Sequence, residues 1–375
     1  MDGKEQEIMK HIQILIKPAS SLCNLRCSYC FYADISSMRQ VRSFGRMKPE
    51  VTGKLIENVF ADLEDGDRLT IGFQGGEPTL AGLKYFKNFT SLVKAQSKKV
   101  IVSYAIQTNG TKIDEEWCRF LKEEDFLVGL SIDGGLEFHD RHRPDAAGRG
   151  TYGRVLAAKK LFDRYEIEYN ILCVLTQEMT ENAPLVWEFI QQEAISFIQF
   201  IPCLAELGEE ENEFAVTPRG FAAFYGELFT LWQQGMQQGQ YVSVKLFDDI
   251  TNLLVNGVVG SCGMLGRCQM QYVIEANGNV YPCDFYVLDE MCVGNITQQT
   301  LRELFEQPLT QRFICDKRDY RTCAGCEFYK MCRGGCKRMK DACYVGAEDD
   351  GYCGYREVLK QVLQPLLAMA APPVH

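Results

Sequence analysis

Histidine is scarce in this chain of 375 residues, which contains four, and tryptophan occurs three times. No run of about eighteen apolar residues is present, so no segment is expected to span a membrane. The first residues, Met1–Glu7, are polar and acidic and lack the basic and hydrophobic regions of a secretion signal. Together these absences predict a protein that stays in the cytoplasm.

An excess of basic residues is also missing. Asp and Glu number 50 against 40 Lys and Arg, which gives a formal net charge of −10. Because an acidic surface repels phosphate backbones, general nucleic-acid binding is not expected. The composition, 46% hydrophobic and 24% charged, is that of a globular protein, and the length favours two or three domains.

Cysteine, in contrast, is abundant, with seventeen residues. In a reducing compartment, regularly spaced thiols indicate metal ligation or catalysis rather than disulfides. Many zinc sites combine Cys with His, but here the clustered thiols must bind metal almost alone. Iron–sulfur clusters, which thiolates hold without histidine, fit this composition.

The first two-thirds of the chain alternates strand-like and helix-like segments. Because such alternation joins parallel strands by right-handed crossovers, it predicts an α/β fold, either an open doubly wound sheet or a partial barrel. The pattern ends near Pro202, and an acidic stretch then leads into a long helix expected from about Pro218 to Gln238. We place a domain boundary after this helix, near residue 240. The expected strands are Ile12–Lys17, Leu69–Phe73, Val100–Gln107, Leu127–Ile132, Tyr169–Leu175 and Phe197–Ile201, and the expected helices are Pro49–Leu63, Gly82–Ala95, Asp114–Lys122, Tyr152–Tyr165 and Ala183–Glu193. Asp114 and Thr151 are expected to cap two of these helices.

The last third, residues 241–375, has a different character. A hairpin is expected over Tyr272–Tyr281, with Asn277-Gly278 in its turn. Around it regular structure thins out and cysteine density rises, as in small domains stapled by metal. A final helix is expected over Tyr355–Met369.

Three cysteines lie close together just after the first expected strand. Cys23, Cys27 and Cys30 have the spacing C-x3-C-x2-C, with the aromatic Tyr29 before the last one. Three thiolates on one loop can hold three irons of a four-iron cubane and leave the fourth open to chelate a small molecule. A zinc site completed by a distant ligand is the alternative.

This motif resembles the signature of the radical S-adenosylmethionine (SAM) superfamily. The resemblance implies a partial (β/α)6 barrel and makes sense of two turns at strand ends, Gly75-Gly76-Glu77-Pro78 and Gln107-Thr108-Asn109-Gly110. Ser131 ends the fourth expected strand at the height of a ribose, and Arg143 is placed to reach the SAM carboxylate, although its His- and Arg-rich segment also fits a solvated loop. The SAM-binding residues predicted in this way are Gln74, Gly75, Gly76, Glu77, Asn109, Ser131 and Arg143, and the resemblance alone adds Tyr29 and Leu204.

The C-terminal cysteines resemble those of the SPASM domain, a cap with two auxiliary [4Fe-4S] clusters. The resemblance assigns Cys262, Cys268, Cys283 and Cys336 to the first auxiliary cluster, and Cys323, Cys326, Cys332 and Cys353 to the second. Two structural zinc sites are the alternative that spacing leaves open. Cys343 lies within the array and is an alternative ligand to Cys336. Cys118 and Cys173 lie in apolar patterns and are expected in the core.

From Ile14 to about Tyr355 the chain resembles the anaerobic sulfatase-maturating enzymes, most distinctly in Leu15–Ser21, Phe73–Gly82 and Val280–Leu288. The resemblance implies oxidation of a Cys or Ser in a sulfatase to Cα-formylglycine. Three [4Fe-4S] clusters and SAM would be the cofactors. The family's mechanism would split SAM into methionine and a 5′-deoxyadenosyl radical, which removes a hydrogen from the substrate Cβ. A base would take the side-chain proton while an auxiliary cluster accepts the second electron. Ser would give the aldehyde directly, and Cys a thioaldehyde that water then hydrolyses. Asp284, next to Cys283, matches the family's base.

The implied partners are an extended segment of a sulfatase polypeptide and an electron donor such as ferredoxin or flavodoxin. A rival enzyme class is the maturase of another ribosomal peptide, which forms thioether or carbon–carbon crosslinks with the same two domains. Many such enzymes carry an N-terminal peptide-binding domain, for which the roughly eleven residues before the first expected strand leave no room. A non-enzyme alternative is an iron–sulfur electron carrier or a zinc-stapled adaptor, which would bind metal without cleaving SAM.

Overall fold

The computed structural model describes residues 9–208, 212–316, 319–346 and 349–370. At its centre lies one ten-stranded sheet, in the order β10-β9-β8-β1-β2-β3-β4-β5-β6-β7. Neighbouring strands from β1 to β7 run parallel. The strands are β1 (His11–Ile16), β2 (Arg68–Phe73), β3 (Ile101–Thr108), β4 (Phe126–Ser131), β5 (Tyr169–Leu175), β6 (Phe197–Pro202), β7 (Ser243–Val244), β8 (Val273–Ile274), β9 (Asn279–Tyr281) and β10 (Gly294–Asn295).

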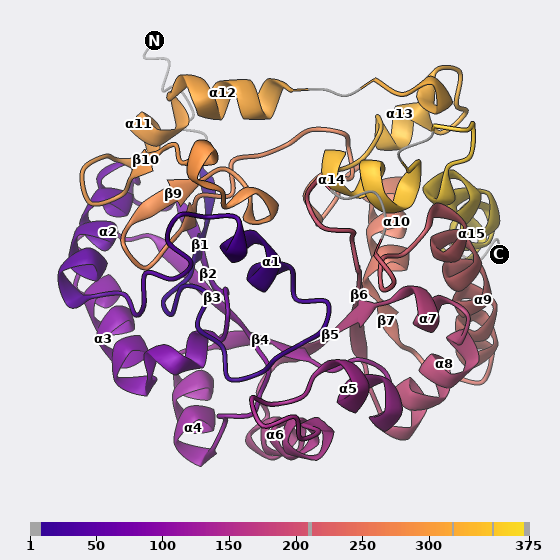
Figure 1. Ribbon diagram of the computed structural model, residues 1–375, viewed down its shortest axis with the longest axis horizontal. Helices are drawn as coiled ribbons and strands as arrows, with labels where there is room; N and C mark the ends of the chain where they lie inside the picture. The colour runs from indigo at the N-terminus through magenta and orange to yellow at the C-terminus, as the bar shows by residue number, and fades with distance from the viewer. Residues whose placement is uncertain (1–8, 209–211, 317–318, 347–348, 371–375) are drawn as a thin grey trace, which may run out of the picture.

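Helices surround the parallel strands on the outside, and the strands curve round the inside of the molecule (Figure 1). This arrangement confirms the partial barrel. The α-helices are α1 (Phe31–Ser37), α2 (Pro49–Ala61), α3 (Leu83–Lys94), α4 (Glu115–Glu123), α5 (Leu136–His142), α6 (Tyr152–Tyr165), α7 (Gln177–Thr180), α8 (Ala183–Gln192), α9 (Pro218–Gln237), α10 (Lys245–Asn256), α11 (Leu301–Phe305), α12 (Pro308–Cys315), α13 (Tyr329–Cys332), α14 (Lys337–Met339) and α15 (Gly354–Ala370). Short 3₁₀ turns include η1 (Pro78–Ala81), η2 (Asp284–Tyr286), η3 (Asp289–Met291) and η4 (Arg321–Cys323), and η5 (Lys340–Tyr344) is a π-helical turn.

The two predicted helix caps have different outcomes. Asp114 caps α4 as expected, because its Oδ1 accepts a hydrogen bond of 2.9 Å from the backbone N–H of Trp117. Thr151 stands at the N-cap of α6, but its side chain makes no capping bond. Instead its hydroxyl donates to the carbonyl of Arg143 at 2.8 Å, so the capping prediction was wrong. Thr151 ties α6 to the end of α5.

The predicted hairpin is confirmed, and it extends the barrel's own sheet. Strand β8 pairs with β1 in parallel, through Leu15 with Val273 and Ile16 with Ile274. Strand β9 returns antiparallel to β8. The turn closes with a hydrogen bond from Gly278 N–H to the Glu275 carbonyl, and a φ of +89° makes glycine the natural residue there. The hairpin therefore brings the segment that follows it against the first barrel strand.

The cysteine-rich end of the chain closes the open side of the barrel, between β1 and β6 (Figure 1). In Figure 1 its elements run along the top, from α11 and α12 above β1 to α13, α14 and α15 above β6 and α9. The final helix α15 packs against α9 and α10. In the described ranges, no helix is long and apolar enough to cross a membrane.

Candidate functional site

A cavity of about 1300 Å³ lies inside the barrel, at the carboxyl ends of its strands. Drug-sized ligands usually occupy roughly 300–1,000 Å³, so this space has room for a cofactor and part of a second molecule. Every predicted SAM-binding residue, all three cysteines of the first cluster and Asp284 line it. These residues are Cys23, Cys27, Tyr29, Cys30, Gln74, Gly75, Gly76, Glu77, Asn109, Ser131, Arg143, Leu204 and Asp284.

The three N-terminal cysteines lie on the loop between β1 and α1, with Cys30 at the N-cap of α1. The backbone on either side of Cys27 is fixed to the segment that follows α5, through Arg26 N–H to the Pro144 carbonyl at 2.8 Å and Ser28 N–H to the His142 carbonyl at 3.0 Å. Two backbone bonds therefore hold this loop over the cavity.

Burial makes two of these thiols, Cys23 and Cys27, poor acids in the absence of metal. It raises the pKa of Cys23 to about 11 and that of Cys27 to about 12. A thiol with so high a pKa is not a free nucleophile, and it releases its proton only when a metal takes its place. Three half-buried thiols on one loop therefore fit cluster ligands better than catalytic nucleophiles.

The turn after β2 packs tightly on the cluster loop. A Cβ atom at Gly76 would lie 2.2 Å from the Leu22 carbonyl oxygen, and one at Gly75 would lie 2.7 Å from the Ser20 carbonyl oxygen. Gly75 also has a φ of +112°. The structure shows that the paired glycines admit the backbone of the cluster loop. Only glycine lets these two loops meet.

Glu77 is fully buried beneath the same turn. Its Oε1 accepts hydrogen bonds from Thr79 N–H at 3.0 Å and from the hydroxyls of Thr79 and Thr108 at 2.5 and 2.8 Å, and its Oε2 accepts one from Asn109 N–H at 2.8 Å. Burial raises the pKa of Glu77, and the hydrogen bonds of its four donors oppose that rise. The carboxylate thus joins the turn after β2 to the turn after β3.

Arg143 forms a buried ion pair with Asp133, at 3.3 Å. Its Nη1 also donates to the Tyr29 hydroxyl at 3.2 Å. Burial opposes the charge of Arg143, but the neighbouring Asp133 carboxylate outweighs it and raises the pKa of the guanidinium. Among the described residues, its Nε has no hydrogen-bond acceptor although it is buried. A buried donor facing a cavity in this way fits the carboxylate of an amino-acid ligand.

The solvated-loop alternative for the segment before Arg143 was wrong. Residues 136–142 form helix α5, and His139 and His142 are buried. Burial lowers the pKa of His139 to about 3, so this imidazole is neutral. The segment is a packed support for the cluster loop.

Asp284 begins η2 and faces the cavity from the C-terminal third of the chain. Its Oδ2 accepts a hydrogen bond of 2.6 Å from the Tyr32 hydroxyl, and its Oδ1 lies 2.8 Å from the Lys17 ammonium. In the described part of the chain, Oδ1 accepts no hydrogen bond of regular geometry. The Tyr32 hydroxyl is also 3.1 Å from Gln74 Oε1. The carboxylate is therefore held by barrel residues, with one oxygen open to a further donor.

Two residues of this site, Lys17 and Tyr32, were not predicted from the sequence. Lys17 stands within a distinctive stretch, Leu15–Ser21, and is a charged residue at the end of an apolar strand. That position carried a signal, since a strand end in an α/β fold points toward the ligand site. Tyr32 follows Cys30 by two residues, and nothing local distinguished it.

The four cysteines assigned to the first auxiliary cluster influence one another. Cys262 and Cys268 line the main cavity. Burial raises the pKa of Cys262, Cys268 and Cys283, and the nearby Cys336 adds to the rise at each of the three. A Cβ at Gly263 would lie 2.6 Å from the Cβ of Cys336, so the two segments touch. One member of the set, Cys283, directly precedes Asp284 in the chain.

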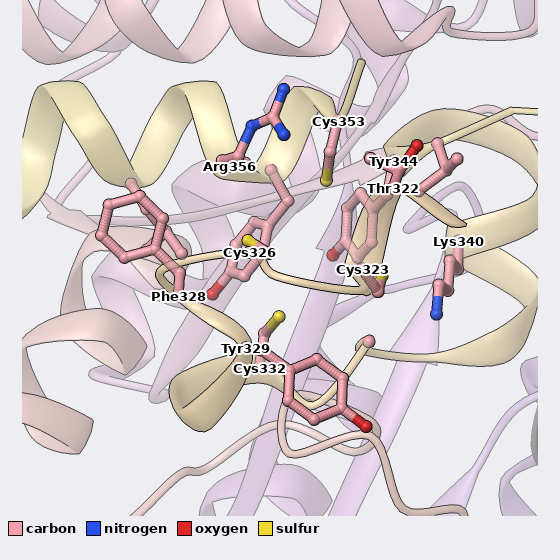
Figure 2. Close-up of a pocket in the computed structure, with 14 residues that line it drawn as sticks. Thr322, Cys323, Cys326, Phe328, Tyr329, Cys332, Lys340, Tyr344, Cys353 and Arg356 are labelled. Carbon is pink, nitrogen blue, oxygen red and sulfur yellow. The ribbon is translucent and has the colours of Figure 1, made fainter. Parts of the chain in front are cut away.

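The four cysteines assigned to the second auxiliary cluster line one separate pocket. Figure 2 shows Cys323, Cys326, Cys332 and Cys353 around this space, with Cys353 entering from the start of α15. Tyr344, Lys340 and Arg356 complete its wall. Four thiols around one space fit a cluster with four cysteine ligands.

Three of the six remaining cysteines lie in the core, away from both cavities. Cys118 and Cys173 are buried in the hydrophobic core, as expected. Cys343 is also fully buried in that core, where its thiol donates to the Met339 carbonyl at 3.4 Å. It lines neither of the two cavities described here.

Two family models match the chain. The model described as "Radical SAM superfamily" matches residues 18–183, and SPASM, "Iron-sulfur cluster-binding domain", matches residues 262–327. The chain therefore has the radical SAM fold with a SPASM cap, and with it the superfamily's SAM and [4Fe-4S] cofactors and auxiliary clusters.

Similar proteins cover almost all of the chain. A cysteine-type anaerobic sulfatase-maturating enzyme of Clostridium novyi (strain NT) is 40% identical over 92% of this chain and 93% of its own length. A serine-type enzyme of Klebsiella aerogenes is 28% identical over 94% and 85%. The solved structure "Native anSMEcpe with bound AdoMet and Kp18Cys peptide" is 38% identical, covers 96% of this chain and 99% of its own, and superposes with a TM-score of 0.87. Streptococcus suis SuiB, at 19% identity and a TM-score of 0.59, shares the fold.

Proposed function

This chain belongs to the anaerobic sulfatase-maturating enzymes of the radical SAM superfamily, and from that premise we propose that it oxidises a cysteine side chain in a sulfatase polypeptide to Cα-formylglycine. The observation that carries the proposal is the single cavity that joins the three-cysteine loop, the SAM-binding turn and Asp284. Cysteine is preferred over serine as substrate because the 40% identical relatives are cysteine-type and the serine-type relatives are 28% identical.

The residues present fit the implied cofactors. Cys23, Cys27 and Cys30 would hold the first cluster, the Arg143 guanidinium would bind the SAM carboxylate, and Asn109 and Ser131 would border the rest of the cofactor. Glu77 would support the SAM site without contacting SAM, because its carboxylate oxygens accept hydrogen bonds from the turns after β2 and β3. When bound, SAM and its cluster supply a radical that removes a hydrogen atom from the substrate Cβ, and the auxiliary clusters supply an electron acceptor.

Asp284 would be the general base. Its Oδ1 is buried and accepts no regular hydrogen bond among the described residues, so it can receive the proton of the substrate thiol. Tyr32 stabilises the other oxygen, and burial followed by the charge of Asp284 raises the pKa of Tyr32 well above its ordinary value. Tyr32 therefore remains neutral and keeps donating its hydrogen bond.

Asp284 also stands beside Cys283, which would ligate the first auxiliary cluster. The proton acceptor would then lie next to the electron acceptor, which suits a substrate that must lose both a proton and an electron. We keep the division near residue 240 as a division of roles, with the barrel binding SAM and residues 241–375 supplying the base and the auxiliary ligands, although the sheet runs through both. Cys336 rather than Cys343 would complete the first auxiliary set.

The external electron donor would be a small carrier such as ferredoxin or flavodoxin. All seventeen cysteines are free in the structure, and eleven of them would ligate iron. Thiols in this number remain reduced in the cytoplasm, where we place the enzyme.

The experiment compares the wild-type protein with Asp284→Asn after anaerobic cluster reconstitution. Each is incubated with SAM, a reductant and a sulfatase-derived cysteine peptide, and formylglycine and 5′-deoxyadenosine are quantified by mass spectrometry. Asp289→Asn is the matched control, because Asp289 begins η3 in the same region and does not line the cavity. Formylglycine should form with wild type and the control but fall by about 10²–10⁴ with Asp284→Asn.

The rival functions give other results. SAM cleavage without oxidation of sulfatase peptides would contradict the proposal and favour a maturase of another peptide. Full iron loading without any SAM cleavage would indicate an electron carrier instead.

A further inference from the structure

Lys17 is a lysine with almost no access to solvent. It follows the last residue of β1 and is 3% exposed. Burying an ammonium group is costly unless a counter-charge compensates it. A buried lysine at the edge of an active-site cavity therefore needs an explanation in terms of what it touches.

The counter-charge of Lys17 is Asp284. The two are 267 positions apart in sequence, and their charged atoms lie 2.8 Å apart. The ammonium also stands 4.7 Å from the centre of the Tyr32 ring, whose hydroxyl donates to the other oxygen of Asp284. Within its own part of the chain, Asp284 has its backbone N–H bound to Gln271 Oε1 at 3.0 Å. Its carboxylate is therefore oriented by the barrel.

The aliphatic stem of Lys17 touches the SAM-binding turn. Its Cβ and Cγ would each lie 3.2 Å from a Cβ at Gly75. Its backbone N–H donates to the carbonyl of Ile274 at 2.8 Å, which fixes the strand from which the side chain extends. One side chain thus spans from the turn beside SAM to the carboxylate expected to take the substrate proton.

We propose that Lys17 is a positioning residue, which holds the Asp284 carboxylate at a fixed place relative to the SAM-binding turn. Hydrogen removal and proton removal act on adjacent atoms of one substrate side chain, so the two acceptors must keep a fixed separation. This inference rests on the proposed function, because it assumes Asp284 as the base.

A second buried ion pair provides the control. Arg39 and Glu275 pair at 2.7 Å, with side chains 2% and 1% exposed, and they also join the segment after α1 to the hairpin. Neither residue lines the main cavity. If Lys17 only tied two parts of the chain together, removing either cation would have the same consequences.

The experiment uses the full-length, cluster-reconstituted protein and compares Lys17→Met, Arg39→Met and Lys17→Arg. Iron content, 5′-deoxyadenosine and formylglycine from a sulfatase-derived cysteine peptide are measured. With Lys17→Met, formylglycine formed per 5′-deoxyadenosine should fall by about tenfold or more, because misplacing a catalytic group by about 1 Å can cost about a hundredfold. Arg39→Met should lower the melting temperature but leave the yield of formylglycine per 5′-deoxyadenosine unchanged. Lys17→Arg should recover part of the yield that Lys17→Met loses.

A double-mutant cycle supplies a readout that needs neither SAM nor substrate. Melting temperatures are compared for Lys17→Met, Asp284→Asn and the double variant. If the ion pair holds Asp284, each single variant melts lower than wild type, and the double variant loses less than the sum of the two shifts. Additive shifts would overturn the inference.

The remaining outcomes are also decisive. An unchanged product ratio in Lys17→Met, or an equal loss of SAM cleavage and product, would overturn the positioning role. If wild-type protein cleaves SAM but makes no formylglycine, the proposed function fails, while the cycle still decides whether Lys17 holds Asp284.

Discussion

Replacing Glu77 with glutamine should damage the SAM site without touching a cofactor ligand. The amide has nearly the size of the carboxylate, but one of its two acceptors becomes a donor. The carboxylate accepts four hydrogen bonds, two of them from the backbone N–H groups of Thr79 and Asn109. The threonine hydroxyls can rotate, but the two backbone N–H groups cannot. Whichever way the amide turns, one buried N–H loses its acceptor.

The size of the effect follows from two losses, which a smaller gain partly offsets. A hydrogen bond to a charged group contributes roughly 1.5–3 kcal/mol, and an unsatisfied buried donor costs about 1–3 kcal/mol. The neutral amide recovers part of the cost of burying a charge, the same cost that raises the pKa of Glu77. The net loss of stability should be about 2–4 kcal/mol. If the distorted turns also lower the binding free energy of SAM by about 1.4 kcal/mol, SAM binds roughly tenfold more weakly.

The assay combines anaerobic denaturant unfolding with equilibrium binding of SAM to the reconstituted protein. Glu57→Gln is the matched control, since Glu57 pairs with Lys54 on the exposed face of α2, where an ion pair contributes about 0–1 kcal/mol. Glu77→Gln should lose both stability and SAM affinity, and Glu57→Gln neither. Wild-type stability and SAM affinity in Glu77→Gln would refute the reasoning.

Three further predictions concern the supports of the clusters. Gly76→Ala should lower the iron content of the first cluster, because the added methyl would lie 2.2 Å from the Leu22 carbonyl, next to a cluster ligand. The backbone N–H and the guanidinium of Arg149 donate hydrogen bonds to Asp145 and hold the pKa of this carboxyl below its ordinary value. The charged carboxylate therefore stabilises the fold above the ordinary pKa, and this stabilisation is lost as the pH falls through the lowered pKa. Asp145→Asn should therefore melt lower than wild type at neutral pH, with the difference shrinking in acid. Cys336→Ser should lose iron on chemical analysis, whereas Cys343→Ser should keep it.

Each of these has a result that would contradict it. Full iron loading in Gly76→Ala would mean that the cluster loop can retreat from the turn. A stability difference in Asp145→Asn that stays constant down to strong acid would mean that the carboxylate's charge is not what stabilises the fold. Loss of iron in Cys343→Ser, with retention in Cys336→Ser, would mean that Cys343 and not Cys336 ligates the cluster.

Much of the barrel could be predicted because its strands and helices carry strong local patterns. Strand β5 and helix α6 have the predicted bounds, and β2 and β6 differ from theirs by one residue at one end. Strands β1, β3 and β4 are each shifted by one residue. Short elements were missed, among them α1 and α5, since a helix of seven residues has too few turns to show periodicity. The parallel pairing of β8 with β1 was also missed, because strand order depends on contacts between segments far apart in sequence.

The candidate site, too, could be predicted from the sequence only in part. The cysteine loop and the turn at Gly75 could be found because spacing and residue type record their chemistry. The environment of Asp284 could not, since it arises where the hairpin docks on β1 and places Lys17 and Tyr32 around the carboxylate. The Thr151 cap failed for a related reason. A tertiary partner, the carbonyl of Arg143, competed with the local backbone for the hydroxyl.

The most direct test of the account follows the hydrogen from the substrate. A sulfatase-derived peptide with a Cβ-deuterated cysteine is incubated with the reconstituted protein, SAM and reductant, and both products are analysed by mass spectrometry. The account predicts deuterium in 5′-deoxyadenosine and formylglycine in the peptide, in matching amounts. Unlabelled 5′-deoxyadenosine with an unchanged peptide would contradict it.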